Sequence, residues 1–165
     1  PDVVVIGKPM GNGHPMGAVI TSEEVAASFA EGVEFFSSFG GNPVSCAIGL
    51  AVLEVIEEEK LQQNALDVGI YFSSLLKTLQ KEDARIGDVR GEGLFIGIEL
   101  INEQKKPNTE LAQFLKNELR KRHVLISTDG PEDSVIKSKP PMVFSKENAE
   151  RVVAELSRGL KMSPL

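Results

Sequence analysis

The sequence has few of the residues that stabilise small domains covalently or through metal ions. Its 165 residues include one cysteine and two histidines. The chain therefore has no cysteine pair for an internal disulfide and no spaced set of ligands typical of a structural metal site. The single cysteine, Cys46, fits a reducing compartment. Because it lies on an apolar helical face, we expect it to be buried.

Long runs of one residue type are also missing. The longest basic stretch is Arg120-Lys121-Arg122 and the net charge is −6, so the electrostatic footprint of nucleic-acid binding is absent. No apolar run approaches a membrane span, and no signal peptide precedes the first strand. We expect one ordinary core, no nucleic-acid or membrane partner, and a cytoplasmic location. An organelle stays open because the chain opens at Pro1 without a methionine.

The first informative feature is Lys8. A β-branched run, Val3–Ile6, is followed at once by Gly, Pro and Asn-Gly within 7–17, which predicts a buried strand ending in a tight turn. Such a turn brings the amine to the rim of a sheet, beside a backbone that glycines keep open for a ligand. A lysine with a lowered pKa attacks carbonyls to form imines. From spacing alone, a solvated strand-end lysine remains the alternative.

Two phosphate-binding motifs are excluded around Lys8. A P-loop has its lysine after the glycines and before Ser or Thr, whereas Lys8 precedes them and Pro9 follows it. The glycines at 11, 13 and 17 are spaced one residue too widely for the dinucleotide fingerprint, and Pro15 interrupts them.

Four blocks resemble, in order, segments of the class III (ornithine-aminotransferase-like) aminotransferases: Pro1–Val19, Phe36–Pro43, Arg90–Leu100 and Ile136–Met142. These are fold-type I enzymes that use pyridoxal phosphate (PLP). The resemblance implies that Lys8 forms the internal aldimine and then moves the proton between the substrate Cα and the cofactor. Within the family, the chain is most similar to the subgroup of ethanolamine-phosphate and hydroxylysine-phosphate phospho-lyases and the second type of alanine–glyoxylate aminotransferase.

The resemblance also implies a cofactor-binding role for Ser38. The family usually has threonine at this position, with its hydroxyl on the cofactor phosphate of the neighbouring subunit. Serine keeps that hydroxyl, so a homodimer with composite sites is expected. Two alternatives remain open: Ser38 is an ordinary turn serine, or Ser37 supplies the hydroxyl.

Lys137 departs from the common family pattern. Many members have arginine at this position, where it binds the substrate carboxylate as a planar fork. Lysine offers a point charge instead, so carboxylate recognition is in doubt, and a pair with Lys139 would tolerate a phosphate. The alternative is two solvated charges on one strand face. For Arg90 and His14 we expect structural roles, at a hairpin start and within a turn.

The expected fold class combines α/β and α+β: the end of the large PLP-binding domain followed by the C-terminal small domain. Residues 1–42 would be an incomplete piece of the large domain, 43–59 a connecting helix, and 60–165 the small α+β domain. Helices are expected after the caps Ser22, Asn42 and Ser145, and over the apolar periodicity that starts at Leu61 and at Leu111. The expected strands are Val3–Ile6, Gly17–Thr21, Ile86–Val89, Gly93–Leu100, Val124–Ser127 and Val135–Lys137.

The leading functional expectation is transfer of an amino group from a primary amine to a 2-oxo acid by the intact enzyme. The rival is phosphate elimination from a phosphorylated amino alcohol such as phosphoethanolamine. A hypothesis of another class is a non-catalytic binding or assembly module. The resemblance places the phosphate-binding loop, the ring-stacking aromatic and the pyridine-facing aspartate upstream, so we expect this chain alone to be inactive.

Overall fold

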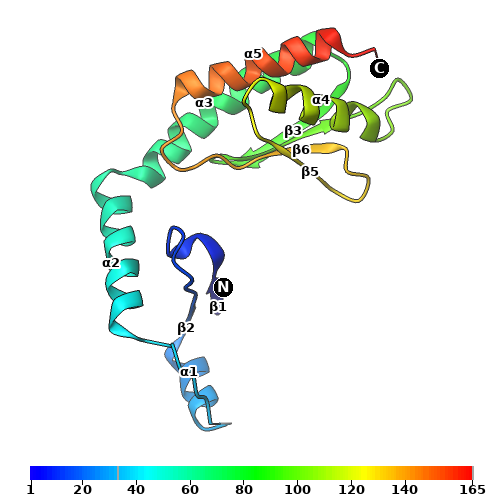
Figure 1. Ribbon diagram of the computed structural model, residues 1–165. Helices are drawn as coiled ribbons and strands as arrows, with labels where there is room; N and C mark the ends of the chain where they lie inside the picture. The colour runs from blue at the N-terminus through cyan, green and yellow to red at the C-terminus, as the bar shows by residue number, and fades with distance from the viewer. Residues whose placement is uncertain (33, 165) are drawn as a thin grey trace. The chain divides into compact units, whose positions relative to one another are not determined.

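The computed structural model describes residues 1–32 and 34–164. The chain divides into two compact units, Pro1–Lys60 and Leu61–Leu165 (Figure 1). This boundary lies close to the predicted end of the connecting helix at residue 59. Assignment of the first unit to a larger domain stays a prediction. Across the described residues, no helix has the length and apolar character needed to cross a membrane.

The first unit consists of a hairpin, a short turn of helix and two α-helices. Strands β1 (Val3–Ile6) and β2 (Ala18–Thr21) pair antiparallel, with Ile6 opposite Ala18. A 3₁₀ turn, η1 (Lys8–Met10), lies in the connection between them. Helices α1 (Glu23–Ala30) and α2 (Pro43–Glu58) follow.

Both helices of this unit begin where capping chemistry predicts. The Ser22 hydroxyl accepts a hydrogen bond from the Val25 amide, and the Asn42 side chain accepts one from the Ser45 amide at 3.0 Å. Each bond satisfies an amide that the helix itself leaves unpaired. Pro43 occupies the first turn of α2, where its missing N–H costs nothing. These predicted helix starts are confirmed.

The prediction that β1 is buried is wrong for this structure. All four of its side chains are exposed, and only Gly11 and Gly49 are buried among the described residues of the unit. The reason is that a two-stranded ribbon lacks the second layer that would cover its faces. Cys46 is likewise exposed rather than buried, because the described residues of the unit leave most of α2 uncovered.

The second unit is a layer of helices on a four-stranded antiparallel sheet. The elements are α3 (Leu61–Glu82), β3 (Ile86–Glu92), β4 (Phe95–Leu100), α4 (Thr109–Lys121), β5 (Ser127–Asp129), β6 (Val135–Ser138) and α5 (Lys146–Met162). The strand order is β3-β4-β6-β5, and every neighbouring pair is antiparallel. Figure 1 shows α3, α4 and α5 together on one face of this sheet.

Alternation along β4 places the core. Ile96, Ile98 and Leu100 are almost completely buried, whereas Phe95 is 59% exposed on the opposite face. This is the predicted period of two. Side chains from the covering helices complete the core, among them Phe72, Leu76, Leu111, Leu115, Leu156 and Leu160.

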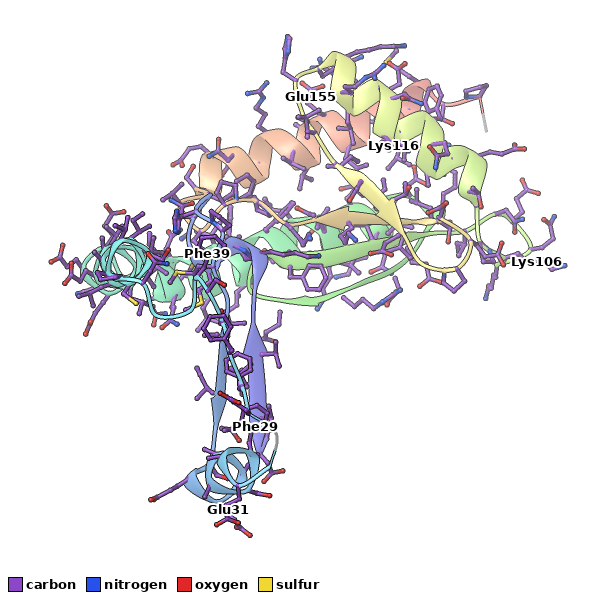
Figure 2. The ribbon with its side chains drawn as sticks, turned by 60° about the horizontal axis from the view of Figure 1, so that its bottom comes forward. Phe29, Glu31, Phe39, Lys106, Lys116 and Glu155 are labelled. Atoms are coloured by element: carbon purple, nitrogen blue, oxygen red, sulfur yellow. The ribbon has the colours of Figure 1, made fainter. Side chains whose placement is uncertain are left out.

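A close backbone approach fixes α3 against the turn between β3 and β4. A Cβ atom at Gly69 would overlap the carbonyl oxygen of Gly93. Only glycine allows the helix to pass this close to the turn. Outside the sheet, Figure 2 shows Lys106 at the outer end of the connection from β4 to α4.

The predicted strand Val124–Ser127 is displaced. The Val124 amide donates to the Leu119 carbonyl at 2.9 Å, so this residue still belongs to the C-terminal cap of α4. The ladder with β6 starts only at Ser127, which pairs with Lys137. The apolar residues before it serve packing: Val124 is buried and Ile126 packs against the core.

Candidate active site

Lys8 lies in a tight turn at the end of β1, as predicted. Its φ is +48°, and the turn is closed by hydrogen bonds from the Asn12 amide to the Pro9 carbonyl at 2.9 Å and from the His14 amide to the Gly11 carbonyl at 3.0 Å. Positive φ is uncommon outside glycine and costs roughly 1 kcal/mol or more. The turn must therefore be held by its surroundings.

The amine of Lys8 is available for chemistry. The residue is exposed, and none of the described residues forms a hydrogen bond or ion pair with its side chain. The backbone nearby is also tightly folded, because a Cβ at Gly11 would overlap the His14 carbonyl oxygen. An exposed, unpaired primary amine on a compact turn can react with the carbonyl group of a ligand.

The two serines before α2 have different surroundings. The Ser37 hydroxyl accepts a hydrogen bond from the Gly40 amide at 3.0 Å, which makes it a turn residue. The Ser38 side chain is exposed and has no hydrogen-bond partner among the described residues. Of the two hydroxyls, that of Ser38 is therefore free to bind a ligand. Within the described residues, no hydrogen bond joins Ser38 to Lys8.

A cluster of polar side chains connects the lysine turn to the start of α2. His14 Nε2 lies 2.7 Å from the Ser45 hydroxyl. The same hydroxyl accepts a hydrogen bond from the Asn42 side-chain amide at 2.9 Å. The expected turn position of His14 is confirmed, but its contact with Ser45 was not predicted. The one available signal was that Ser45 lies three residues after a capping asparagine.

In the second unit, Lys137 lies on the outer face of the sheet. Arg90, Gly97 and Lys137 are neighbours across β3, β4 and β6, and together line a hollow of about 460 Å³. Phe95 and Asp129 also line it. The next row of residues across the sheet holds two acidic side chains, because Val135 pairs with both Asp129 and Glu99. Cationic and acidic residues therefore lie in adjacent rows on this face.

Carboxylates hold both cations of this face. Lys137 forms an ion pair with Asp129. This hydrogen bond, together with one from the Gly130 amide, lowers the pKa of Asp129. Arg90 bonds to Asp88 at 2.8 Å and Glu99 at 2.5 Å, which raises the pKa of Arg90. Arg90 thus has the structural role expected for it.

Lys139 follows the end of β6 and is exposed. It lines a second hollow with His123 and Arg151, whereas Lys137 lines the hollow beside Arg90. A shared phosphate site formed by the two lysines stays a prediction. Elsewhere in the described residues, no group of three potential metal ligands comes together.

Comparisons with known proteins decide the family. The model of the aminotransferase class-III family matches residues 1–160. The chain belongs to the class III aminotransferase family. It is 54% identical over 154 residues to the alanine–glyoxylate aminotransferase 2-like protein of Drosophila melanogaster, covering 91% of this chain and 31% of that protein. It is 39% identical over 165 residues to ethanolamine-phosphate phospho-lyase homolog 1 of Caenorhabditis elegans, covering 98% and 35%.

Solved structures show the same fold. A phospholyase from Arthrobacter in complex with phosphoethanolamine superposes with a TM-score of 0.96 at 42% identity, over 99% of this chain and 39% of that one. An amine transaminase from an uncultivated Pseudomonas species, solved with PLP bound, gives 0.86 at 27% identity over 98% and 38%. The predicted fold class, the enzyme family and PLP as its cofactor are confirmed. The chain spans about a third of the length of the curated relatives.

Proposed function

We propose that this class III aminotransferase chain is part of a PLP-dependent enzyme that moves an amino group from a primary amine to a 2-oxo acid. The observation that carries the proposal is the Lys8 turn: an exposed, unpaired amine at the end of β1, in a chain whose family is established. The residues present fit the cofactor, because a free amine suits its aldehyde and the free Ser38 hydroxyl suits its phosphate.

Lys8 has two tasks in this proposal. Its amine would hold the cofactor covalently, and once released by substrate it would take the proton from the substrate's amine-bearing carbon. One side chain can do both because the long stem of lysine keeps the amine near the same carbon. When bound, PLP supplies the electron sink for the pair left on that carbon.

The test compares the intact enzyme with its Lys8→Ala variant. We expect the wild-type enzyme with PLP to show a visible absorbance band and to convert a primary amine and pyruvate into aldehyde and alanine. The variant should lack both the band and the reaction. Lys60→Ala is a matched control outside the turn. An unchanged band and rate in the Lys8→Ala variant would contradict the proposal.

Phosphate elimination is the second candidate, and Lys137 favours it. Lysine at position 137 lacks the planar guanidinium fork that binds a carboxylate through two parallel hydrogen bonds, so the carboxylate contact common in the family is missing. The similarity to a phospho-lyase homolog and to a phospholyase solved with phosphoethanolamine supports the same candidate. Incubation of the intact enzyme with phosphoethanolamine distinguishes the two reactions. Acetaldehyde, ammonia and inorganic phosphate indicate elimination, whereas pyruvate-dependent alanine formation indicates amino transfer.

A homodimer with composite sites is the proposed assembly. Three phenylalanines around Ser38, namely Phe35, Phe36 and Phe39, are 72%, 83% and 84% exposed. Figure 2 shows Phe39 on this segment, with its side chain drawn beside the ribbon. Exposed aromatic residues next to a proposed phosphate ligand suit burial against a second copy. Full activity in a species that sedimentation shows to be monomeric would contradict this.

A non-catalytic assembly module would keep the fold without the chemistry. Retention of Lys8 and of the glycines in 7–17 and 40–41 argues against that reading, because a module without catalysis has no need to keep them together. Failure of the intact protein to bind PLP in the Lys8 test would support it.

A further inference from the structure

The turn that carries Lys8 is attached to α2 at two points. His14 Nε2 lies 2.7 Å from the Ser45 hydroxyl, across 31 residues of sequence. One helical turn further on, a Cβ at Gly49 would lie 2.8 Å from the Sδ and Cε atoms of Met16, so this side chain packs against the bare backbone there. Residues four apart in a helix lie on one face. The segment after Lys8 therefore docks along one face of α2.

Ser45 is itself fixed by the helix cap. Asn42 Oδ1 accepts from the Ser45 amide at 3.0 Å, which determines which way the Asn42 amide points. Its Nδ2 then donates to the Ser45 hydroxyl at 2.9 Å and to the Phe39 carbonyl at 2.7 Å. The serine oxygen accepts this bond and keeps its own proton, which it can donate to an unprotonated His14 Nε2. The hydrogen bonds of the α2 N-cap therefore continue through the Ser45 hydroxyl to the imidazole of His14.

The turn needs such an attachment. Lys8 and Asn12 both have positive φ, +48° and +47°. Residues other than glycine keep this conformation only where other contacts impose it. The β1–β2 ladder joins the two ends of the connection through the pair of Ile6 and Ala18. His14 holds its middle.

We propose that His14 is a positioning residue for Lys8: its hydrogen bond to Ser45 fastens the lysine turn to the N-terminus of α2 and so sets where the amine is presented. The inference rests on the proposed role of Lys8 toward PLP. His14 does not touch the reacting atoms. It acts through the backbone of 8–14, and small displacements of a reacting group reduce rates strongly.

The experiment uses the intact enzyme freed of PLP and follows the visible absorbance band after PLP is added back. His14→Phe keeps the ring volume and removes Nε2. We expect the band to form roughly tenfold more slowly, with kcat lowered by a similar factor and KM for the amine little changed. Ser45→Ala should have the same effect, and the double variant should be no slower than either single one.

Rescue separates positioning from general stability. His14→Gln can place its amide oxygen close to the position of Nε2, where it accepts from the Ser45 hydroxyl. It should restore most of the rate, but only while Ser45 is present. The matched control is His123→Asn in the second unit, where asparagine tolerates the positive φ of +60°. This variant should form the band at the wild-type rate.

The outcomes distinguish this inference from the proposed function. Loss of the band in Lys8→Ala, together with a wild-type rate in His14→Phe or in Ser45→Ala, would overturn the positioning role alone. A band that survives in Lys8→Ala would overturn the proposed function instead. If His14→Phe is insoluble, the rate in Ser45→Ala decides.

Discussion

The two compact units of this chain differ in where their apolar side chains lie. All the buried hydrophobic side chains among the described residues belong to Leu61–Leu165. In Pro1–Lys60, by contrast, Val5, Phe36 and Phe39 are 75%, 83% and 84% exposed. Burial of apolar area is the main source of folding free energy. The second unit thus has its own source of stability, whereas the described residues of the unit that contains Lys8 bury no hydrophobic side chain.

This contrast separates two kinds of sequence information. In Leu61–Leu165 the apolar pattern mainly encodes packing within the unit. In Pro1–Lys60 the apolar residues of β1 and several of α2 are exposed and form no core among the described residues of the unit. We therefore expect the geometry of the Lys8 turn to depend on local hydrogen bonds and on contacts with other parts of the intact enzyme.

The largest expected effect concerns the two units produced separately. A polypeptide of residues 61–165 should show a cooperative thermal transition followed by circular dichroism, because it contains the whole buried core. A polypeptide of residues 1–60 should show no such transition. Cooperative melting of residues 1–60, without cooperative melting of residues 61–165, would contradict the assignment of the stable core to the second unit.

The next largest effect is expected from substitutions of two phenylalanines that differ in burial. Phe72 is completely buried, whereas Phe39 is 84% exposed. Phe72→Ala should lower the free energy of unfolding by about 3–5 kcal/mol, because it removes a core side chain and leaves a cavity. Phe39→Ala should change it by less than about 0.5 kcal/mol. Urea unfolding of both variants measures the difference. Equal losses in the free energy of unfolding would show that the exposed fraction of a side chain does not identify the core.

A smaller effect is expected for an ion pair within the second unit. Arg85 bonds to Asp83 at 2.7 Å and to the Leu160 carbonyl at 2.8 Å, which ties the start of β3 to α5. Asp83→Asn should lower the free energy of unfolding by about 1 kcal/mol at neutral pH. The control Asp67→Asn keeps an acceptor for its neighbour Gln63 and should have little effect.

The ionisation of Asp83 makes this contribution to stability depend on pH. Hydrogen bonds from the Arg85 side chain lower the pKa of Asp83 below its ordinary value of 3.8. A lowered pKa means that the stabilisation is fully present above pH 3.8 and is lost as the pH falls through the folded-state value. Wild type and Asp83→Asn should therefore converge in stability below about pH 4. A difference that persisted or grew in acid would contradict the pairing.

The smallest effect is expected for PLP binding by the 165-residue chain on its own. Among the described residues, the Lys8 amine and the Ser38 hydroxyl are the groups that fit the cofactor. We expect weak binding that depends little on Lys8, measured by absorbance titration of this chain and its Lys8→Ala variant. Tight binding that requires Lys8 would show that the first unit is already organised.

Features that depend on neighbouring residues could be predicted from the sequence. The helix starts at Asn42-Pro43 and Ser145 follow from capping side chains that act within three residues. The alternation of β4 follows from the pleat. The turn at Lys8 follows from glycine, proline and Asn-Gly in succession.

Features that depend on distant residues could not be predicted. Whether β1 is buried depends on a second layer of structure, which apolar character alone does not supply. The start of β5 depends on how α4 is capped by Val124 and on where β6 offers a partner. The contact of His14 with Ser45 joins residues 31 apart, and the position of Ser45 three residues after the capping Asn42 does not indicate that partner.

The central claim is that Lys8, on the unit without a core of its own, is the residue that binds PLP covalently. The most direct measurement is borohydride reduction of the intact enzyme with PLP, followed by peptide mass mapping. The account predicts one stable PLP adduct, on the peptide that contains Lys8. An adduct on another lysine such as Lys60 or Lys137, with the Lys8 peptide unmodified, would contradict it.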